Sequence, residues 1–205
     1  MTTDVRGTVN GNAVADGNEP REPARSQQLT QWLVGLVNSR DYGRLAELRR
    51  PSISENAHIE AGWIAGWNDE EHRKVFEQVA FLFAVYHRGA IEPSWGYGSL
   101  GYAARRIGSS IGRGPDDAGA SRLMDRIVAS RRPPQRHLQH AIARLRSCGE
   151  PPPSWARLAD DIARWTDRQA RIRYRWAVDF HAPPPRTTRN TRTTTTTTTT
   201  KDTLK

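Results

Sequence analysis

The side chains best suited to chemistry in this sequence are arginines concentrated between residues 122 and 146. Seven arginines stand there against a single acid, Asp125. They are Arg122, Arg126, Arg131, Arg132, Arg136, Arg144 and Arg146. A guanidinium group is planar and can bind two phosphate oxygens at once. Like charges four residues apart repel on a helix, and a phosphate partner removes that cost by neutralising them. The segment therefore predicts a surface that binds the backbone of nucleic acid.

The helix expected after Pro134 separates this charge from its apolar side. With about 100° between residues, Arg136, His140 and Arg144 lie within about 80° of one another. The apolar residues of the same helix occupy the opposite side: Leu138, Ala141, Ile142 and Leu145. A basic stripe opposite an apolar stripe predicts one face toward the core and one toward a polyanion.

Other basic residues occur in smaller groups. Arg49 with Arg50, and Arg105 with Arg106, are candidates for a second and a third nucleic-acid patch. A further group lies near four acids and is expected to form structural ion pairs. Its arginines are Arg168, Arg171, Arg173 and Arg175, and the acids are Asp160, Asp161, Asp167 and Asp179.

Catalytic and metal-binding patterns are weak, so the sequence predicts a protein that is not an enzyme and needs no cofactor. His137 and His140 share a helix face, but arginines flank them and no carboxylate is placed to complete a metal site. The pairs Asp116–Asp117 and Asp160–Asp161 are expected in first turns of helices, where the helix dipole favours acids. Cys148 is the only cysteine, and no nearby base would activate it. The glycine-rich segment 96–101 follows an expected helix, whereas a dinucleotide loop follows a strand.

Charge supports a polyanionic partner for the folded part of the chain. The 205 residues carry a net charge of +9, of which residues 26–181 hold +6. Lysine occurs at only three positions, so codon bias is an alternative source of the many arginines. The start lacks an apolar run, and the longest run, 79–86, is far shorter than a bilayer span. A cytoplasmic protein without membrane contact is expected.

Composition divides the chain into four parts. Residues 1–25 are rich in Gly, Asn, Asp and Thr and are predicted to be a disordered head. Residues 182–205 form a low-complexity tail with eight consecutive threonines, also predicted to be disordered. Between them we expect two packed helical lobes, 26–114 and 115–181. The segment 51–68 receives no assignment.

Apolar residues in the middle region recur with the period of a helix, which predicts an all-α fold, a helical bundle without strands. Asp41, Asn68 to Glu71, Asp116 with Asp117, Ser154 and Asp167 mark expected helix starts. The helix from about Asn68 to His87 is apolar nearly all round in its second half. It should therefore be the most buried helix.

The order of these segments resembles the CasB family, the small subunit of the type I-E CRISPR Cascade complex, from about residue 28 to 180. The N-terminal motifs are Arg44-Leu-Ala-Glu-Leu-Arg49-Arg50, Val75-Phe76, Leu82-Phe83-Ala84 and Gly98-Ser99-Leu100-Gly101. The C-terminal motifs are Arg122-Leu123-Met124, His137-Leu138, Trp155-Ala-Arg-Leu158, Asp160-Asp161-Ile-Ala-Arg-Trp165 and Trp176-Ala177-Val178-Asp179-Phe180. Each motif alone is weak, and their order and spacing carry the likeness.

The resemblance implies a helical, non-enzymatic subunit, present in two copies beside the backbone and large subunits of Cascade. It implies contact with crRNA and target DNA, holding the heteroduplex and guiding the displaced strand in antiviral defence. Such proteins read backbone and shape while base pairing reads sequence. This agrees with the arginine patches, and we expect little stacking of bases on surface aromatic residues.

Three other functions stay open from the residues themselves. A different helical nucleic-acid-binding adaptor or a transcriptional regulator would need an exposed recognition helix, and the turn at 131–134 lacks the expected small residues. A scaffold without nucleic acid would attribute the charge to codon bias. An enzyme would need a site that the sequence does not reveal.

Overall fold

The computed structural model describes residues 24–50, 56–66 and 69–182, which are helical apart from their connections and one isolated β-bridge between Gly108 and Arg113. The expected all-α class is confirmed. The predicted disordered head and threonine-rich tail lie outside the described residues, except at positions 24, 25 and 182. Within the described ranges no helix is both long and apolar enough to cross a bilayer.

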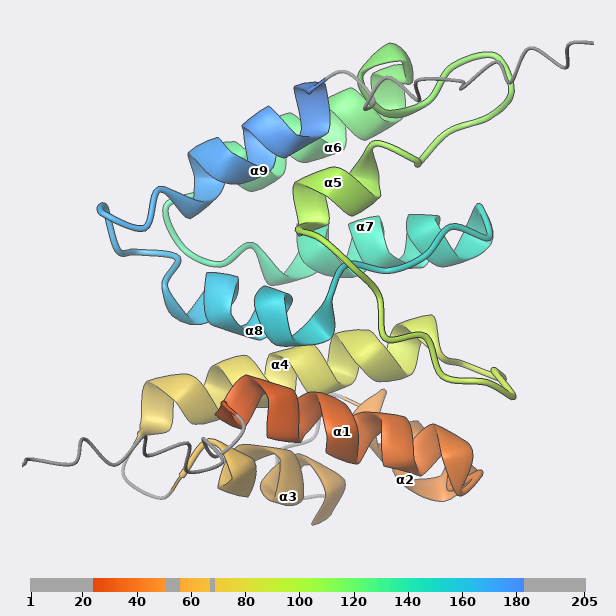
Figure 1. Ribbon diagram of the computed structural model, residues 1–205, viewed down its shortest axis with the longest axis vertical. Helices are drawn as coiled ribbons and strands as arrows, with labels where there is room; N and C mark the ends of the chain where they lie inside the picture. Colours follow the sequence, from red (N-terminus) through yellow and green to blue (C-terminus); the bar gives the residue numbers. More distant parts are fainter. Residues whose placement is uncertain (1–23, 51–55, 67–68, 183–205) are drawn as a thin grey trace, which may run out of the picture.

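The helices follow the chain in two groups. The first contains α1 (Arg25–Asn38), α2 (Tyr42–Leu48), α3 (Asn56–Ile64) and α4 (Glu70–Tyr86). The second contains α5 (Leu100–Ala104), the 3-10 turn η1 (Gly114–Asp116), α6 (Ala118–Ala129), α7 (Gln135–Ser147), α8 (Trp155–Ala163) and α9 (Ile172–His181). Figure 1 shows α1–α4 at one end of the molecule and α5–α9 stacked above them.

Short polar side chains begin several helices as the sequence predicts. The carboxylates of Asp41, Asp69 and Asp117 accept the backbone N–H three residues later. The hydroxyl of Ser154 does the same at α8. These bonds satisfy N–H groups that have no partner inside the helix, which fixes where each helix starts.

Two sequence expectations differ from the structure, and one helix was not predicted. The last helix begins at Ile172 rather than Asp167, because the Asp167 carboxylate accepts the N–H of Gln169 in a turn. Asp160 and Asp161 lie in the second half of α8, so the helix dipole does not explain them. α3 lies in a segment to which the sequence assigned nothing.

Helix α4 is the centre of the packing. Phe76, Val79, Leu82 and Phe83 are buried, as expected for this helix. α4 packs against α1, α2 and α3 on one side and against α7 and α8 on the other. One hydrophobic cluster consequently runs through both groups of helices. The division into lobes 26–114 and 115–181 stays a prediction.

A buried histidine joins α4 to the loop before α5. The Nδ1–H of His87 donates to the carbonyl of Phe83 at 2.9 Å, and Nε2 accepts the N–H of Ser94 at 2.9 Å. The ring stacks on Phe83 and is 1% exposed. Both ring nitrogens are thus used by the neutral imidazole. Burial, helped by the cation of Arg146, lowers the pKa of His87 to about 4.

We therefore expect acid to destabilise the fold through His87. The unfolded chain takes up a proton near pH 6.5, while the folded chain resists until about pH 4. Stability is full above pH 6.5 and falls by roughly 2–3 kcal/mol as the pH drops to 4. Thermal melting at a series of pH values would measure the fall, with His87→Gln as the control that cannot titrate. If both proteins lose stability equally, the prediction is wrong.

Candidate nucleic-acid interface

Five of the predicted arginines form an open basic surface, here called the hairpin surface, on α6, α7 and their connection. They are Arg122, Arg126, Arg131, Arg132 and Arg136. All five are exposed, and no acid in the described part of the chain forms an ion pair with them. The apolar sides of the two helices are buried beneath them, at Leu123 and Ile127 in α6 and at Leu138 and Ile142 in α7. The structure thus leaves these guanidinium groups to solvent.

Arg144 differs from the other hairpin arginines. Its guanidinium lies 3.1 Å from the carboxylate of Asp117, the residue that caps α6. The N–H of Ala120, followed by Arg144, holds the pKa of Asp117 below its usual value. Arg144 therefore ties the start of α6 to the end of α7, which makes it a poor probe of binding.

The predicted patch at Arg105 and Arg106 is largely used inside the protein. Both residues are half-buried. The Arg106 guanidinium lies 4.7 Å from the ring centre of Tyr97 and donates to the Tyr97 hydroxyl. It also approaches the carboxylate of Glu150 at 3.4 Å. Arg106 consequently holds the loop before α5 against the end of α7.

Arg49 lies in a cluster of cations from three parts of the chain. Its neighbours are Arg88, which follows α4, and Arg146 near the end of α7. Arg146 donates to the backbone carbonyl of Arg88. Burial, together with these two cations, lowers the pKa of Arg49. Arg50 is exposed and its carbonyl accepts from His58.

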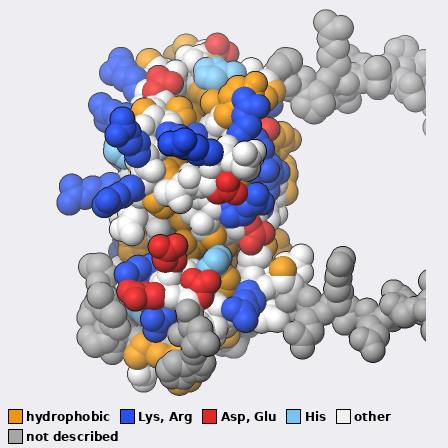
Figure 2. All heavy atoms as spheres, turned by 90° about the vertical axis from the view of Figure 1, so that its left-hand side faces the viewer, with side chains coloured by type: hydrophobic (Ala, Val, Ile, Leu, Met, Phe, Trp, Pro, Cys, Tyr) orange, Lys and Arg blue, Asp and Glu red, His pale blue; other side chains and the backbone are white. Residues whose placement is uncertain are grey.

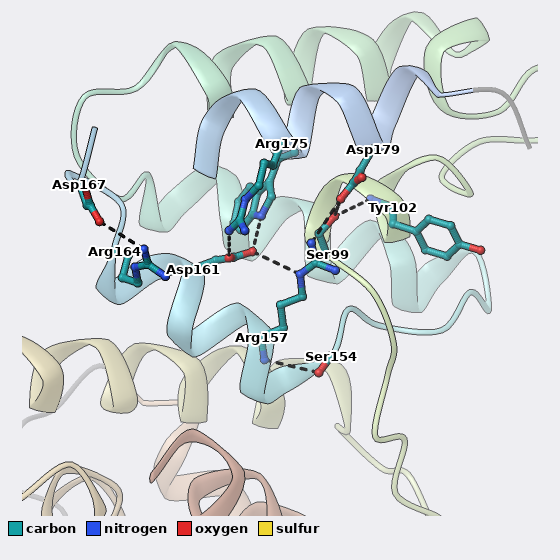
Figure 3. A network of polar contacts seen from close by, with 10 residues as sticks. Ser99, Tyr102, Ser154, Arg157, Asp161, Arg164, Asp167, Arg175 and Asp179 are labelled. Carbon is teal, nitrogen blue, oxygen red and sulfur yellow. Dashed lines mark hydrogen bonds and ion pairs between the residues drawn. The ribbon is translucent and has the colours of Figure 1, made fainter. Parts of the chain in front are cut away.

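Asp161 on α8 and Asp179 on α9 accept hydrogen bonds and ion pairs from residues of neighbouring helices (Figure 3). Asp161 is 3% exposed; it accepts the indole N–H of Trp176 at 2.6 Å and a guanidinium N–H of Arg175 at 2.8 Å. Arg157 lies 3.9 Å from Asp161 and 3.7 Å from Asp179, which in turn accepts the hydroxyl of Ser99. This network joins α5, α8 and α9. The structural role expected for Arg175 is therefore confirmed.

The same expectation is wrong for the other three arginines of that group. Arg168, Arg171 and Arg173 are exposed, and within the described ranges no acid pairs with them. Asp167, which was expected to pair with this group, contacts Arg164 at 3.4 Å instead. The reason is that Arg168 and Arg171 lie in the connection before α9 rather than in the helix predicted to start at Asp167.

Tertiary packing brings these arginines beside the hairpin surface. The indole N–H of Trp165, at the end of α8, donates to the carbonyl of Ser130 between α6 and α7 at 3.2 Å. The α6–α7 and α8–α9 connections accordingly lie at the same side of the molecule (Figure 1). Figure 2 shows this side, with Lys and Arg gathered over its upper part, where some acids lie among them, and a further group of acids lower down.

Several aromatic side chains are exposed in the described part of the chain. Trp63, Trp95, Tyr97 and Tyr174 are each about half exposed, between 48% and 57%. Tyr174 lies on α9 next to the unpaired arginines. Helical spacing could not have identified its pairing with Arg171, because Arg171 lies before the start of α9 with a left-handed backbone.

Metal-binding side chains do not cluster in the described ranges. No three residues among His, Cys, Asp and Glu are arranged there to hold a metal ion. Cys148 is exposed at the end of α7, with the carbonyl of Gly108 at 3.6 Å. The described part is thus an all-α protein that carries a set of exposed arginines without acidic partners.

Comparison with known proteins assigns this helical protein to a family. Residues 44–181 match the family model described as CRISPR-associated protein Cse2. The match spans more than half of the chain, so the protein belongs to the Cse2 family, which is also called CasB.

The fold agrees with this assignment. The crystal structure of CasB from Thermobifida fusca superposes with a TM-score of 0.58 and 19% sequence identity. The alignment covers 77% of this chain and 96% of that one. No curated protein matches the sequence.

Proposed function

We propose that this chain is a non-catalytic subunit of a CRISPR Cascade complex that holds nucleic acid through its hairpin surface. The observation that carries the proposal is the set of five exposed arginines without acidic partners in the described ranges. Elsewhere in those ranges many exposed cations are already paired, as Lys74 is with Glu70 and Arg44 with Glu60. Unpaired guanidinium groups on one surface are best neutralised by phosphates.

The ligands would be crRNA and target DNA, held by charge and shape rather than by base edges. Within Cascade we propose that two copies lie beside the backbone and large subunits, stabilising the heteroduplex and the displaced strand. Backbone contacts of this kind carry little sequence preference. Family membership supports the setting, and the arginine chemistry supports the ligand class.

Removing three charges from the hairpin surface should weaken binding. DNA affinity falls as salt rises, and the slope of log affinity against log salt concentration, here called the salt slope, reflects the number of phosphate contacts. We expect Arg122→Gln, Arg126→Gln and Arg136→Gln together to flatten this slope by about three units, one for each lost contact. Helicity should not change, because these side chains avoid the buried faces of α6 and α7. The measurement is DNA affinity of the full-length chain, and of the assembled complex, across a salt series.

A matched control removes three charges from the α1–α4 group, with Arg40→Gln, Arg44→Gln and Lys74→Gln. It changes net charge equally but leaves the hairpin surface intact, so the slope should stay near that of the unchanged protein. Equal effects of both triple variants would reduce the proposal to net charge alone. An unchanged slope in the hairpin variant would contradict it. Strong preference for one DNA sequence would instead favour a transcriptional regulator.

A further inference from the structure

A small pocket opens where the end of α6 meets the connection between α8 and α9. Its volume is about 300 Å³, at the lower end of the range for sites that bind small organic ligands. Val128 and Trp165 contribute apolar surface, and Trp165 is fixed by its hydrogen bond to Ser130. Arg168, Arg171 and Arg173 line the pocket as well. The pocket therefore combines an apolar wall with cations.

One wall of the pocket is a preformed stack of a cation and an aromatic ring. The guanidinium carbon of Arg171 lies 4.3 Å from the centre of the Tyr174 ring, and Tyr174 is 57% exposed. Arg171 adopts φ 47°, in the left-handed region that residues with a Cβ rarely occupy. Such strain is concentrated at ligand sites in proteins. Bases of single-stranded nucleic acid stack on aromatic rings and on guanidinium planes of this kind.

The charge of the pocket is uncompensated within the described residues. Arg168, Arg171 and Arg173 form no ion pair there. The lining acid, Asp167, is engaged by Arg164 and by the N–H of Gln169. Two observations, an open stack and free cations, thus point to a ligand with both a flat ring and a phosphate.

We propose that this pocket binds one nucleotide of a single strand. The base stacks on the Arg171–Tyr174 pair, while Arg168 and Arg173 bind the flanking phosphates. Bases inside a duplex are already stacked and paired, so the pocket selects single strands. Arg131 and Arg132 lie on the connection that Trp165 holds against the pocket, so a strand leaving the pocket meets the hairpin surface. The inference deepens the proposed function and rests on it.

The test uses the full-length chain and three labelled DNAs of equal length: a single strand, the same strand with abasic sites, and a duplex. Tyr174→Ala should weaken binding of the single strand roughly tenfold or more, the loss typical of one stacked base. Its affinity for the abasic strand and the duplex should not change, nor should the salt slope. Tyr174→Phe keeps the ring and should bind as the unchanged protein does.

A second variant separates charge from stacking. Arg168→Gln with Arg173→Gln should flatten the slope of log affinity against log salt concentration for the single strand by about 1.4 units, because each lost phosphate contact on a single strand removes about 0.7. The pocket is wrong if Tyr174→Ala leaves single-strand binding unchanged, or weakens abasic and ordinary strands equally. Should the pocket fail in this way, the proposed function still stands as long as the unchanged protein binds DNA with a steep salt slope. If it shows no salt-dependent binding to any of the DNAs, both fail.

Discussion

Replacing Gly101 by alanine should lower the free energy of unfolding by about 3 kcal/mol, the upper end of the usual cost of overpacking, because the helix cannot accept even one methyl group there. A Cβ at this position would lie 2.0 Å from the backbone carbonyl oxygen of Trp176. That oxygen belongs to α9, so α5 and α9 would have to move apart. Both helices contribute to the buried core, and the movement would open it. Chemical denaturation of the variant measures the loss.

The matched control is Gly35→Ala in α1. Gly35 is also helical, and no atom outside its neighbourhood lies within 4 Å of a Cβ built there. Alanine is a better helix former than glycine, so this change should stabilise the protein by roughly 0.5–1 kcal/mol. Opposite signs for the two substitutions would show that close helix packing, rather than helix propensity, requires glycine at 101. A normal stability for Gly101→Ala would contradict the packing of α5 on α9.

Asp161→Ala should cost roughly 3 kcal/mol, because it leaves the buried indole N–H of Trp176 without a partner and removes the acid between Arg157 and Arg175. The measurement is again denaturant unfolding, followed by tryptophan fluorescence. A loss below about 1 kcal/mol would show that water or another group replaces the carboxylate.

Asp161→Asn gives the comparison that separates hydrogen bonding from charge. Burial raises the pKa of Asp161 despite the hydrogen bond from Trp176 and the two cations. Asparagine keeps an acceptor for the indole and avoids the cost of burying a charge. It should therefore be less destabilising than alanine. If both variants lose the same free energy of unfolding, Asp161 stabilises the fold through its charge rather than through its hydrogen bond to Trp176.

The residues at these two sites belong to the sequence motifs on which the family resemblance rests. Ser99, Gly101, Asp161 and Trp176 all belong to motifs that carry the resemblance, and each makes a contact between two of the helices α5, α8 and α9. The exposed hairpin arginines beyond Arg122 lie outside those motifs. The motifs therefore report the fold, while binding is proposed for side chains that the fold leaves free.

The sequence by itself determined the helical class, most helix starts and the central position of α4. Local chemistry is sufficient for these features, because a capping carboxylate at Asp41 or an apolar face from Val75 to Phe83 acts within a few residues. It also identified Arg122, Arg126, Arg131, Arg132 and Arg136 as candidates. Their spacing on two amphipathic helices requires only helical geometry.

Only the tertiary structure decided which arginines are free. Arg144 pairs with Asp117 across 27 residues, and Arg106 with Glu150 across 44, so neither pairing is visible in local spacing. Arg168, Arg171 and Arg173 were expected to pair with nearby acids, yet Asp161 faces Trp176 and Arg175 instead. Ion pairs depend on where helices cross, and burial of the apolar faces fixes those crossings. The pocket beside Tyr174 exists for the same reason, since Trp165 and Ser130 meet only when α8 packs beside the α6–α7 connection.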